Sequence, residues 1–413
     1  MSLQNLSIVL AERPTAEIVP GQTFKAEQKP VPKADDLKDG EILIENWYLS
    51  LDPAMRGWLN DKRSYIPPVQ IGETMRGATV GRVVASKSPK AKEGDVLPAL
   101  GGWAEYSVLH DSRVEPVSAF PAVSQPVDYL SAIGLTGLTA YFGMLHVGDP
   151  KPGETVVVSG AAGATGSVAG QIAKLKGARV VGIAGSDDKC RWLTEELGFD
   201  AALNYKDPDF RHKFKDATPD YINVYFDNVG GDILDMALSR AKEFSRFVMC
   251  GGISQYNSAT PQGPKNYSNI ITMRIKMQGF IVFDFAKEYP QARKDLAQWL
   301  EEGKLKRKET IIKGGLKAAE QALVDLYKGI NTGKLIVEIK NPKDAAKLII
   351  PANEIARNVF DHVAASSKHE HNRDLEHVQD VVAPRSVSAA GAKTANDDGI
   401  SIPKRLDIDP AFD

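Results

Sequence analysis

The chain has few cysteines, almost no net charge and no long hydrophobic run. Only two cysteines, Cys190 and Cys250, occur among its 413 residues. Two cysteines exclude a disulfide framework and a multi-cysteine zinc site. The net charge of -2 gives no electrostatic reason to expect nucleic acid or an anionic membrane as a partner. We therefore expect small-molecule partners and a chemistry that uses no metal.

Export and membrane signals are also missing. The first residues, MSLQNLSIVLAERPTAE, lack a basic start followed by a long apolar core, and no later run reaches transmembrane length. This absence predicts a cytoplasmic protein. The 43% hydrophobic and 25% charged content is typical of a soluble chain, and 413 residues are enough for two domains with their own cores.

Residues 155–174 have the sequence TVVVSGAAGATGSVAGQIAK. This segment predicts a strand, then a glycine-rich turn, then a helix. Val156 to Val158 form a short β-branched run that indicates a buried parallel strand. Val168, Ile172 and Leu175 have the spacing of one helical face. The start of a helix has unpaired N–H groups and partial positive charge, which together bind phosphate.

The dinucleotide fingerprint G-x-G-x-x-G occurs here as Ala161-x-Gly163-x-x-Gly166, with alanine at the first position. A lone match of this kind is weakly specific, and the alternative is a glycine turn that only packs a helix on a strand. The strand before it and the helix after it favour a nucleotide site.

The end of the next strand distinguishes NADP from NAD. ARVVGIA ends in Gly185-Ser186, where an acidic residue would bind the adenine ribose of NAD, and Lys189 follows. A cation beside small polar residues suits a 2′-phosphate, so the sequence favours NADP. The alternative is that Lys189 is a solvated residue of the next helix, beside Asp187 and Asp188.

The chain divides into segments that differ in composition and in predicted secondary structure. Residues 1 to about 125 contain short strands broken by Pro and Gly, which indicate a β-rich barrel. Residues from about 126 to 310 alternate strands with helical patterns, which predicts an α/β fold with a doubly wound parallel sheet. Residues 311 to 341 predict a helix and a strand that could return to the first domain. The remainder, 342–413, is low in aromatics and predicts a peripheral or partly disordered extension.

The loops after the strands of such a sheet line its ligand crevice. Tyr48, just before the Asp52-Pro53 turn, is a candidate substrate contact, and the alternative is a core tyrosine with a satisfied hydroxyl. Four loops after strands are chemically distinctive: NYK at 204–206, DNVGG at 227–231, CGGISQYN at 250–257 and FIVFDF at 280–285.

Six motifs in order resemble one family: NWYLSLDPAMR, LTGLTAYFGM, SGAAGATGSVAGQIAK, FDNVGGDILD, MCGGISQYN and NTGKLIVEI. Over residues 5 to 341 the chain resembles the zinc-independent branch of the medium-chain dehydrogenase/reductase superfamily, and in particular the prostaglandin/leukotriene reductases and alkenal double-bond reductases. The resemblance implies a GroES-like barrel over 1–125, completed by 311–341, and a Rossmann domain over 126–310. It also implies NADPH in the cleft between them, and a homodimer.

Matching motifs carry the family's cofactor contacts onto this chain. The resemblance assigns Gly163 to Gly166 to the pyrophosphate, and Lys189 and Tyr205 to the 2′-phosphate. The full implied set is Thr136, Gly163, Ala164, Thr165, Gly166, Ser186, Lys189, Tyr205, Asn228, Cys250, Gly251, Ile253, Ser254, Tyr256, Ile281, Phe283 and Asn331.

The chemistry expected of this branch needs a neutral hydrogen-bond donor. An α,β-unsaturated carbonyl compound accepts hydride at its β-carbon, and negative charge then collects on the carbonyl oxygen. A tyrosine hydroxyl, with a pKa near 10, is protonated at neutral pH and can stabilise that oxygen. Tyr256 is the candidate, and the alternative is a packing residue. Cys250 is interpreted as a small apolar residue that ends a strand. Tyr48, Met55 and Phe283 would favour an apolar or aromatic enone.

The sequence thus leads to an NADPH-dependent reductase of activated carbon–carbon double bonds. Two alternatives stay open at this point. One is a quinone reductase, since a quinone is also a conjugated acceptor. The other is a non-catalytic NADP(H)-binding sensor or structural protein.

Overall fold

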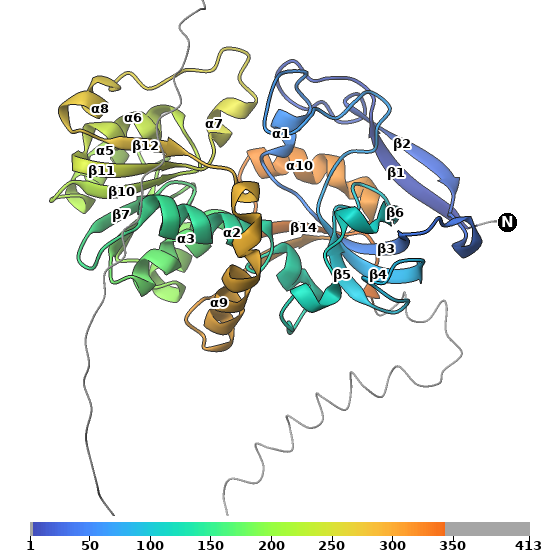
Figure 1. The fold of residues 1–413 in the computed structure, drawn as a ribbon. Coiled ribbons are helices and arrows are strands. Elements are labelled where there is room, and N and C mark those ends of the chain that lie inside the picture. The colour runs from blue at the N-terminus through green and yellow to red at the C-terminus, as the bar shows by residue number, and fades with distance from the viewer. Residues whose placement is uncertain (1–2, 343–413) are drawn as a thin grey trace, which may run out of the picture. The chain divides into compact units, whose positions relative to one another are not determined.

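A parallel β-sheet built from residues 155–279 carries the glycine-rich loop. The structure is a computed structural model that describes residues 3–342, so the predicted extension lies outside the described residues from 343 onward. Within the described part, the sheet has six strands in the order β12-β11-β10-β7-β8-β9, all parallel (Figure 1). The prediction of a doubly wound α/β sheet is confirmed. The strands are β7 (Thr155–Val158), β8 (Arg179–Ala184), β9 (Ala201–Asn204), β10 (Ile222–Asp227), β11 (Ala241–Met249) and β12 (Lys276–Gly279).

Helices cover both faces of this sheet. Val156 and Val158 pack into the cluster on one face, and Val157 packs into the cluster on the other. Side chains alternate along a strand, so an apolar run without alternation indicates burial on both sides. The first cluster draws on α2 (Leu135–Phe142), α3 (Ala164–Leu175) and α9 (Tyr289–Glu301), and the second on α5 (Phe210–Ala217) and α6 (Gly231–Ser239).

Strand β12 ends at Gly279, and the FIVFDF segment expected as a loop leads into the 3-10 helix η7 (Val282–Glu288). One predicted helical face differs from the structure. Leu175 is the last residue of α3 and is 39% exposed, so the apolar face of this helix ends before it. The remaining short elements of this half are η5 (Gly143–Gly148), α4 (Asp187–Arg191), η6 (Trp192–Glu196), α7 (Ile253–Tyr256) and α8 (Ser268–Thr272).

A second, mostly antiparallel sheet gathers strands from both ends of the described chain. Its order is β13-β14-β3-β4-β5, with β6 also paired to β3. Strand β14 lies antiparallel to β3, with Ile336 opposite Ser50, which joins residues 334–338 to the N-terminal sheet. The strands are β3 (Glu41–Ser50), β4 (Thr79–Ser86), β5 (Val96–Ala99), β6 (Tyr106–His110), β13 (Glu309–Ile312) and β14 (Lys334–Glu338).

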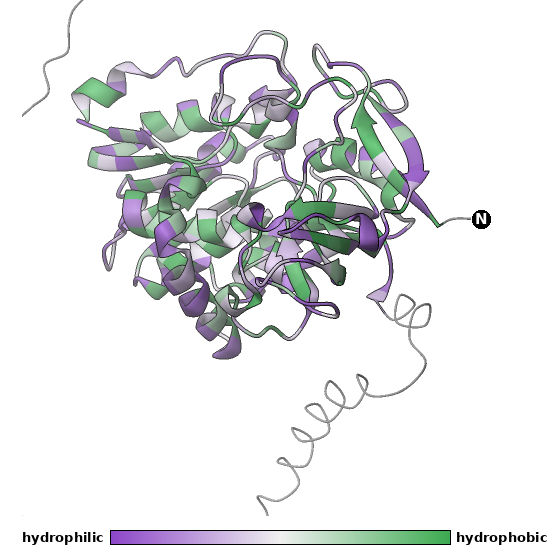
Figure 2. Ribbon diagram, turned by 45° about the vertical axis from the view of Figure 1, so that its right-hand side comes forward, coloured by the Kyte–Doolittle hydropathy of each residue, from purple (hydrophilic) through white to green (hydrophobic). Residues whose placement is uncertain are grey.

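A separate antiparallel pair, β1 (Gln4–Leu10) and β2 (Phe24–Pro30), lies beside this sheet. Figure 2 shows the contrast between hydrophobic β1 and mainly hydrophilic β2, which matches the burial of one strand and the exposure of the other. The helical elements of this half are η1 (Ala34–Asp36), α1 (Met55–Trp58), η2 (Asp111–Arg113), η3 (Val117–Ala119), η4 (Pro126–Leu130), η8 (Leu316–Ala318) and α10 (Ala319–Tyr327).

A search for helices long and apolar enough to cross a membrane found none in residues 3–342.

Candidate active site

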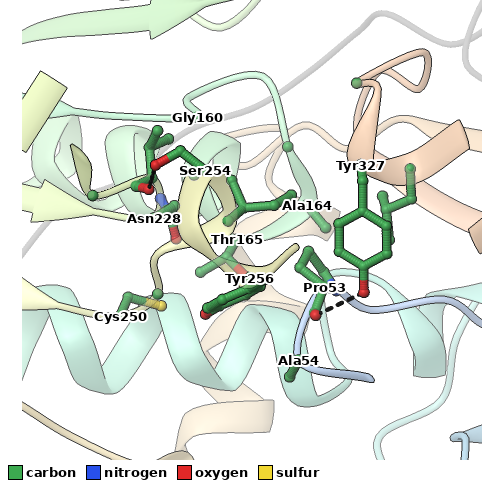
Figure 3. Close-up of a pocket in the computed structure, with 18 of the residues that line it drawn as sticks. Pro53, Ala54, Gly160, Ala164, Thr165, Asn228, Cys250, Ser254, Tyr256 and Tyr327 are labelled. Carbon is green, nitrogen blue, oxygen red and sulfur yellow. Dashed lines mark hydrogen bonds between the residues drawn. The ribbon is translucent and has the colours of Figure 1, made fainter. Parts of the chain in front are cut away.

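A cavity of about 810 Å³ opens at the carboxyl ends of the parallel strands, opposite the Asp52–Ala54 turn that follows β3 (Figure 3). Its volume lies within the range of about 300–1,000 Å³ that is usual for small-molecule sites. All the predicted cofactor contacts except Ser186 line it: Thr136, Gly163, Ala164, Thr165, Gly166, Lys189, Tyr205, Asn228, Cys250, Gly251, Ile253, Ser254, Tyr256, Ile281, Phe283 and Asn331. Strands that end at one edge of a sheet bring these distant loops together.

Two glycines of the loop resist larger residues, one because of its backbone conformation and one because of close packing. Gly160 has a φ of +57°, a conformation that favours glycine. A Cβ on Gly166 would lie 2.4 Å from the carbonyl oxygen of Gly160. Ala161, at the first fingerprint position, is fully buried, and its Cβ faces Gly182 of β8, where an added Cβ would lie only 3.1 Å away. The facing glycine thus makes room for alanine in the fingerprint.

The first turn of α3 offers unpaired donors to the cavity. The N–H groups of Ala164, Thr165 and Gly166 precede the first residue that can bond back along the helix. No described side chain caps this helix. On the facing loop, Asn228 donates from its side-chain amide to the carbonyl of Ser159 at 2.7 Å. A helix start that is open in this way fits the pyrophosphate of a dinucleotide.

The other end of the cavity is basic. Lys189 Nζ donates to the carbonyl of Gly329, and burial followed by the charge of Lys206 lowers the Lys189 pKa below its ordinary value. The ring of Tyr205 covers Gly185, because a Cβ at Gly185 would lie 3.1 Å from it. Ser186, alone in the predicted set, does not line the cavity, although its neighbour Gly185 does. Its hydroxyl accepts the N–H of Lys189 at 3.3 Å and so caps α4.

Tyr256 lies in the cavity at the end of α7. Its hydroxyl accepts the backbone N–H of Gly252 at 3.0 Å. Figure 3 shows this hydroxyl turned toward the Cys250 end of the same loop. No acceptor for the hydroxyl proton occurs among the described residues, so the O–H can donate to a ligand. Burial raises the Tyr256 pKa above the ordinary 10.0, although the Gly252 N–H opposes the rise, and the group is therefore neutral at physiological pH.

The raised pKa of Tyr256 predicts that its hydroxyl limits activity only at strongly alkaline pH. A protonated hydroxyl is present below its pKa and is lost as pH rises through it. Because that pKa lies above 10.0, turnover should show no loss from this group between about pH 6 and about pH 9. The measurement is the pH dependence of kcat for an enone. A decline centred near neutral pH that disappears in Tyr256→Phe would contradict the prediction.

Both cysteine thiols are poor nucleophiles in this fold. Burial raises the pKa of the Cys250 thiol to about 12 and that of the Cys190 thiol to about 11. The thiolate is the reactive form, so both side chains stay protonated at neutral pH. Cys250 lines the cavity, where it contributes an apolar surface below Tyr256.

Two of the three predicted substrate contacts lie away from the cavity wall in the structure. Tyr48 and Met55 do not line the cavity. Tyr48 packs against Val80 and Ile336, because alternation along β3 turns it to the face opposite Leu49. Met55 is fully buried in the core of the N-terminal half. Phe283, the third, lines the cavity and is 43% exposed.

Two aromatic residues that the sequence did not single out take these places. Trp58 and Tyr65 both line the cavity, and the Tyr65 hydroxyl accepts the indole N–H of Trp58 at 2.7 Å. The ring centroids of Tyr65 and Phe283 are 6.4 Å apart. The presence of aromatic residues soon after the Asp52-Pro53 turn could have indicated that they line the cavity. The polar sequence around Tyr65, however, has no periodicity from which the position of its side chain could be predicted.

The Asp52–Ala54 turn is anchored from the C-terminal segment. Lys334, only 2% exposed, donates from Nζ to Asp52 Oδ1 at 2.6 Å and to the carbonyl of Leu51 at 2.9 Å. The hydroxyl of Tyr327 donates to the carbonyl of Pro53 at 3.0 Å, drawn as a dashed line in Figure 3. The neighbouring N–H of Gly333 donates to the carbonyl of Ala162 in the glycine-rich loop at 2.8 Å. One segment therefore holds both walls of the cavity.

Comparisons with known proteins agree with this geometry. Family models described as the N-terminal domain of oxidoreductase and as zinc-binding dehydrogenase match residues 7–117 and 164–299. The putative NADP-dependent oxidoreductase YfmJ of Bacillus subtilis is 44% identical, over 83% of this chain and 100% of its own length. The chain belongs to the medium-chain dehydrogenase/reductase superfamily. The crystal structure of CurA in complex with NADPH from Vibrio vulnificus is 39% identical and superposes with a TM-score of 0.74, over 82% of this chain and 100% of that chain.

A further relative places this medium-chain reductase in the branch expected from its motifs. The 2-alkenal reductase (NADP(+)-dependent) of Nicotiana tabacum is 39% identical, over 72% of this chain and 87% of its own length. Although one matching model carries the description zinc-binding, residues 3–342 contain no group of three or more His, Cys, Asp and Glu side chains placed to hold a metal ion.

The tight glycine loop of this medium-chain reductase leads to a further prediction. Gly166→Ala should weaken NADPH binding about tenfold or more, because the new methyl group would lie only 2.4 Å from the Gly160 carbonyl oxygen and must push the start of α3 away from it. A fluorescence titration with NADPH measures the effect. Gly57→Ala is the matched control, since nothing lies within 4 Å of its added Cβ. Unchanged affinity in Gly166→Ala would show that this helix start does not hold the phosphates.

Proposed function

We propose that this medium-chain reductase uses NADPH to reduce the carbon–carbon double bond of α,β-unsaturated ketones and aldehydes. One observation carries the proposal: the Tyr256 hydroxyl is held by the Gly252 N–H, with its own proton available, on the wall of a cavity that also contains the glycine-rich loop. The similarity to a 2-alkenal reductase supports the same substrate class.

The cofactor is NADP(H), and the residues present fit it. The open start of α3 would receive the pyrophosphate, and Lys189 with Tyr205 would receive the 2′-phosphate. No acidic residue follows β8 in the place that binds an NAD ribose, since Gly185 and Ser186 stand there. When bound, NADPH supplies the hydride that the β-carbon of an enone accepts.

Tyr256 acts on the oxygen of the substrate. As hydride reaches the β-carbon, charge moves to the carbonyl oxygen, and a preorganised neutral O–H stabilises that charge without having to reorient. The Gly252 N–H restrains the hydroxyl and makes the phenol a better donor. The Tyr256 hydroxyl either keeps its proton as a hydrogen-bond donor or transfers it to the enolate.

The cavity wall favours a flat, apolar substrate. Trp58, Tyr65 and Phe283 contribute aromatic surface on the side of the Asp52–Ala54 turn. Aromatic rings pack well against other rings and conjugated systems, with centroids about 4.5–7 Å apart. We therefore extend the proposal to aryl and long-chain enones, for which Tyr65 offers a second hydroxyl near the site.

A substrate panel tests the proposal. Purified full-length protein is assayed with enals, aryl enones and quinones, each with NADPH and with NADH. We expect consumption of enones with a preference for NADPH. Consumption of quinones alone would replace the proposal by a quinone reductase. Cofactor binding without turnover of any substrate would indicate a non-catalytic NADP(H)-binding protein.

We also propose that the protein is a homodimer. In the described part of the chain, β12 is an edge strand of the parallel sheet, paired only with β11. An edge strand has unpaired N–H and C=O groups that a second copy can satisfy. Light scattering after size-exclusion chromatography measures the mass, and a monomer at micromolar concentration would overturn this proposal.

A further inference from the structure

Two lysines line the cavity beside Gly185, at the end of β8 and β9. Lys189 and Lys206 both line it, one on α4 and the other just after β9. Lys206 Nζ lies 5.8 Å from the centroid of the Tyr205 ring, which places its charge at the same wall. The two are close enough for Lys206 to lower the Lys189 pKa.

Two acidic side chains close to these lysines in sequence have other partners. Asp187 Oδ1 accepts the side-chain N–H of Asn204 at 2.9 Å. Asp207 pairs with Lys213 at 2.5 Å. Within residues 3–342, neither Lys189 nor Lys206 forms an ion pair with a carboxylate. Two neighbouring like charges repel each other, and an anion between them removes that repulsion.

Gly185, Lys189, Tyr205 and Lys206 all line this end of the cavity. Gly185 contributes no side chain, and the ring of Tyr205 packs within 3.1 Å of where its Cβ would be. The wall between the two lysines therefore consists of backbone and one tyrosine, with no acidic group from the described part of the chain. We propose that Lys206 is a second cationic ligand of the 2′-phosphate and a determinant of the preference for NADPH over NADH. This inference rests on the proposed function, because it requires NADPH to be the cofactor.

Lys206 would contribute electrostatic attraction to the 2′-phosphate. Its ammonium group is on an exposed residue next to Tyr205, so its contribution is screened by solvent and salt. The effect should therefore be moderate, confined to ligands that carry the 2′-phosphate, and reduced at high ionic strength.

Isothermal titration calorimetry on full-length protein tests this role without turnover. The probes are NADPH, NADH and adenosine 2′,5′-bisphosphate, with wild type, Lys206→Gln and Lys206→Arg. We expect Lys206→Gln to bind NADPH and the bisphosphate about five- to tenfold more weakly, with NADH unchanged. Lys206→Arg should retain most of the affinity. Lys215→Gln is the control, because it removes the same charge from an exposed residue of α5 outside the cavity.

The outcomes separate this inference from the proposed function. If wild type prefers NADPH and Lys206→Gln shows the same preference, Lys206 is a solvated residue and the inference is wrong, while the proposed function stands. Equal weakening of NADPH and NADH would also overturn it, because that pattern indicates a packing defect. If wild type itself shows no preference for NADPH, the cofactor assignment in the proposed function fails first.

Discussion

Tyr256→Phe should lower kcat for enone reduction by on the order of 10² to 10³, the loss seen when one oxyanion-stabilising donor is removed. The substitution deletes one oxygen and keeps the ring that fills the cavity wall. The charge that develops on the carbonyl oxygen would then lack the hydroxyl held by Gly252. Steady-state and single-turnover rates with NADPH and an aryl enone measure the effect.

Two controls isolate the hydroxyl from the packing of the loop. NADPH affinity and the melting temperature should change little in Tyr256→Phe, although the Gly252 N–H loses its acceptor. Tyr65→Phe is the matched variant, because it deletes the other tyrosine hydroxyl on the cavity wall and should slow turnover much less. If Tyr65→Phe is the slow variant and Tyr256→Phe is not, the two roles are exchanged and the proposed mechanism is wrong.

Lys334→Met should destabilise the protein by about 3 kcal/mol, the lower end of the cost of removing one partner from a buried ion pair. Lys334 is 2% exposed and its partner Asp52 is 24% exposed, so the remaining carboxylate would be only partly hydrated. The Asp52–Ala54 turn would also lose its anchor at the Leu51 carbonyl. We expect KM for the enone to rise more than the dissociation constant of NADPH. Urea unfolding and initial rates measure the two effects.

A double-mutant cycle gives the sharper test of this ion pair. Asp52→Asn in the Lys334→Met background should cost less than the sum of the two single changes, because the unpaired carboxylate is then gone. Lys340→Met is the control, since Lys340 pairs with Glu45 at 3.3 Å and does not line the cavity. It should leave KM unchanged. A loss below about 1 kcal/mol with unaltered KM in Lys334→Met would show that the turn holds its position without this lysine.

Local patterns in the sequence were sufficient to predict the half of the fold that contains the parallel sheet. The run Val156–Val158 is buried on both faces, and the glycine-rich loop leads directly into α3, as predicted. These features depend on neighbours in sequence, where periodicity and turn chemistry are strongest. The end of the apolar face of α3 was less well predicted, because Leu175 has the helical spacing but is the exposed last residue of the helix.

That the loops after the parallel strands share one cavity was predictable for the same reason. In a parallel sheet, every loop after a strand reaches the same edge, so strand order alone brings Asn228, Cys250 and Lys189 to one cavity. Ser186 was assigned to this set by motif, and only the structure shows that its hydroxyl caps α4 while its side chain is not part of the wall.

The sequence by itself determined the α/β class, the glycine-rich helix start and the basic residue after β8, because each depends on residues that are close together along the chain. The tertiary structure decided which residues line the wall of the cavity that follows β3. Tyr48 lies away from the cavity because of the face of β3 on which it stands. Trp58 lines the cavity after a turn that is anchored by Lys334, which is hundreds of residues away along the chain. The pairing of β14 with β3 brings these segments together, and contacts between distant segments leave no periodic signal in either one.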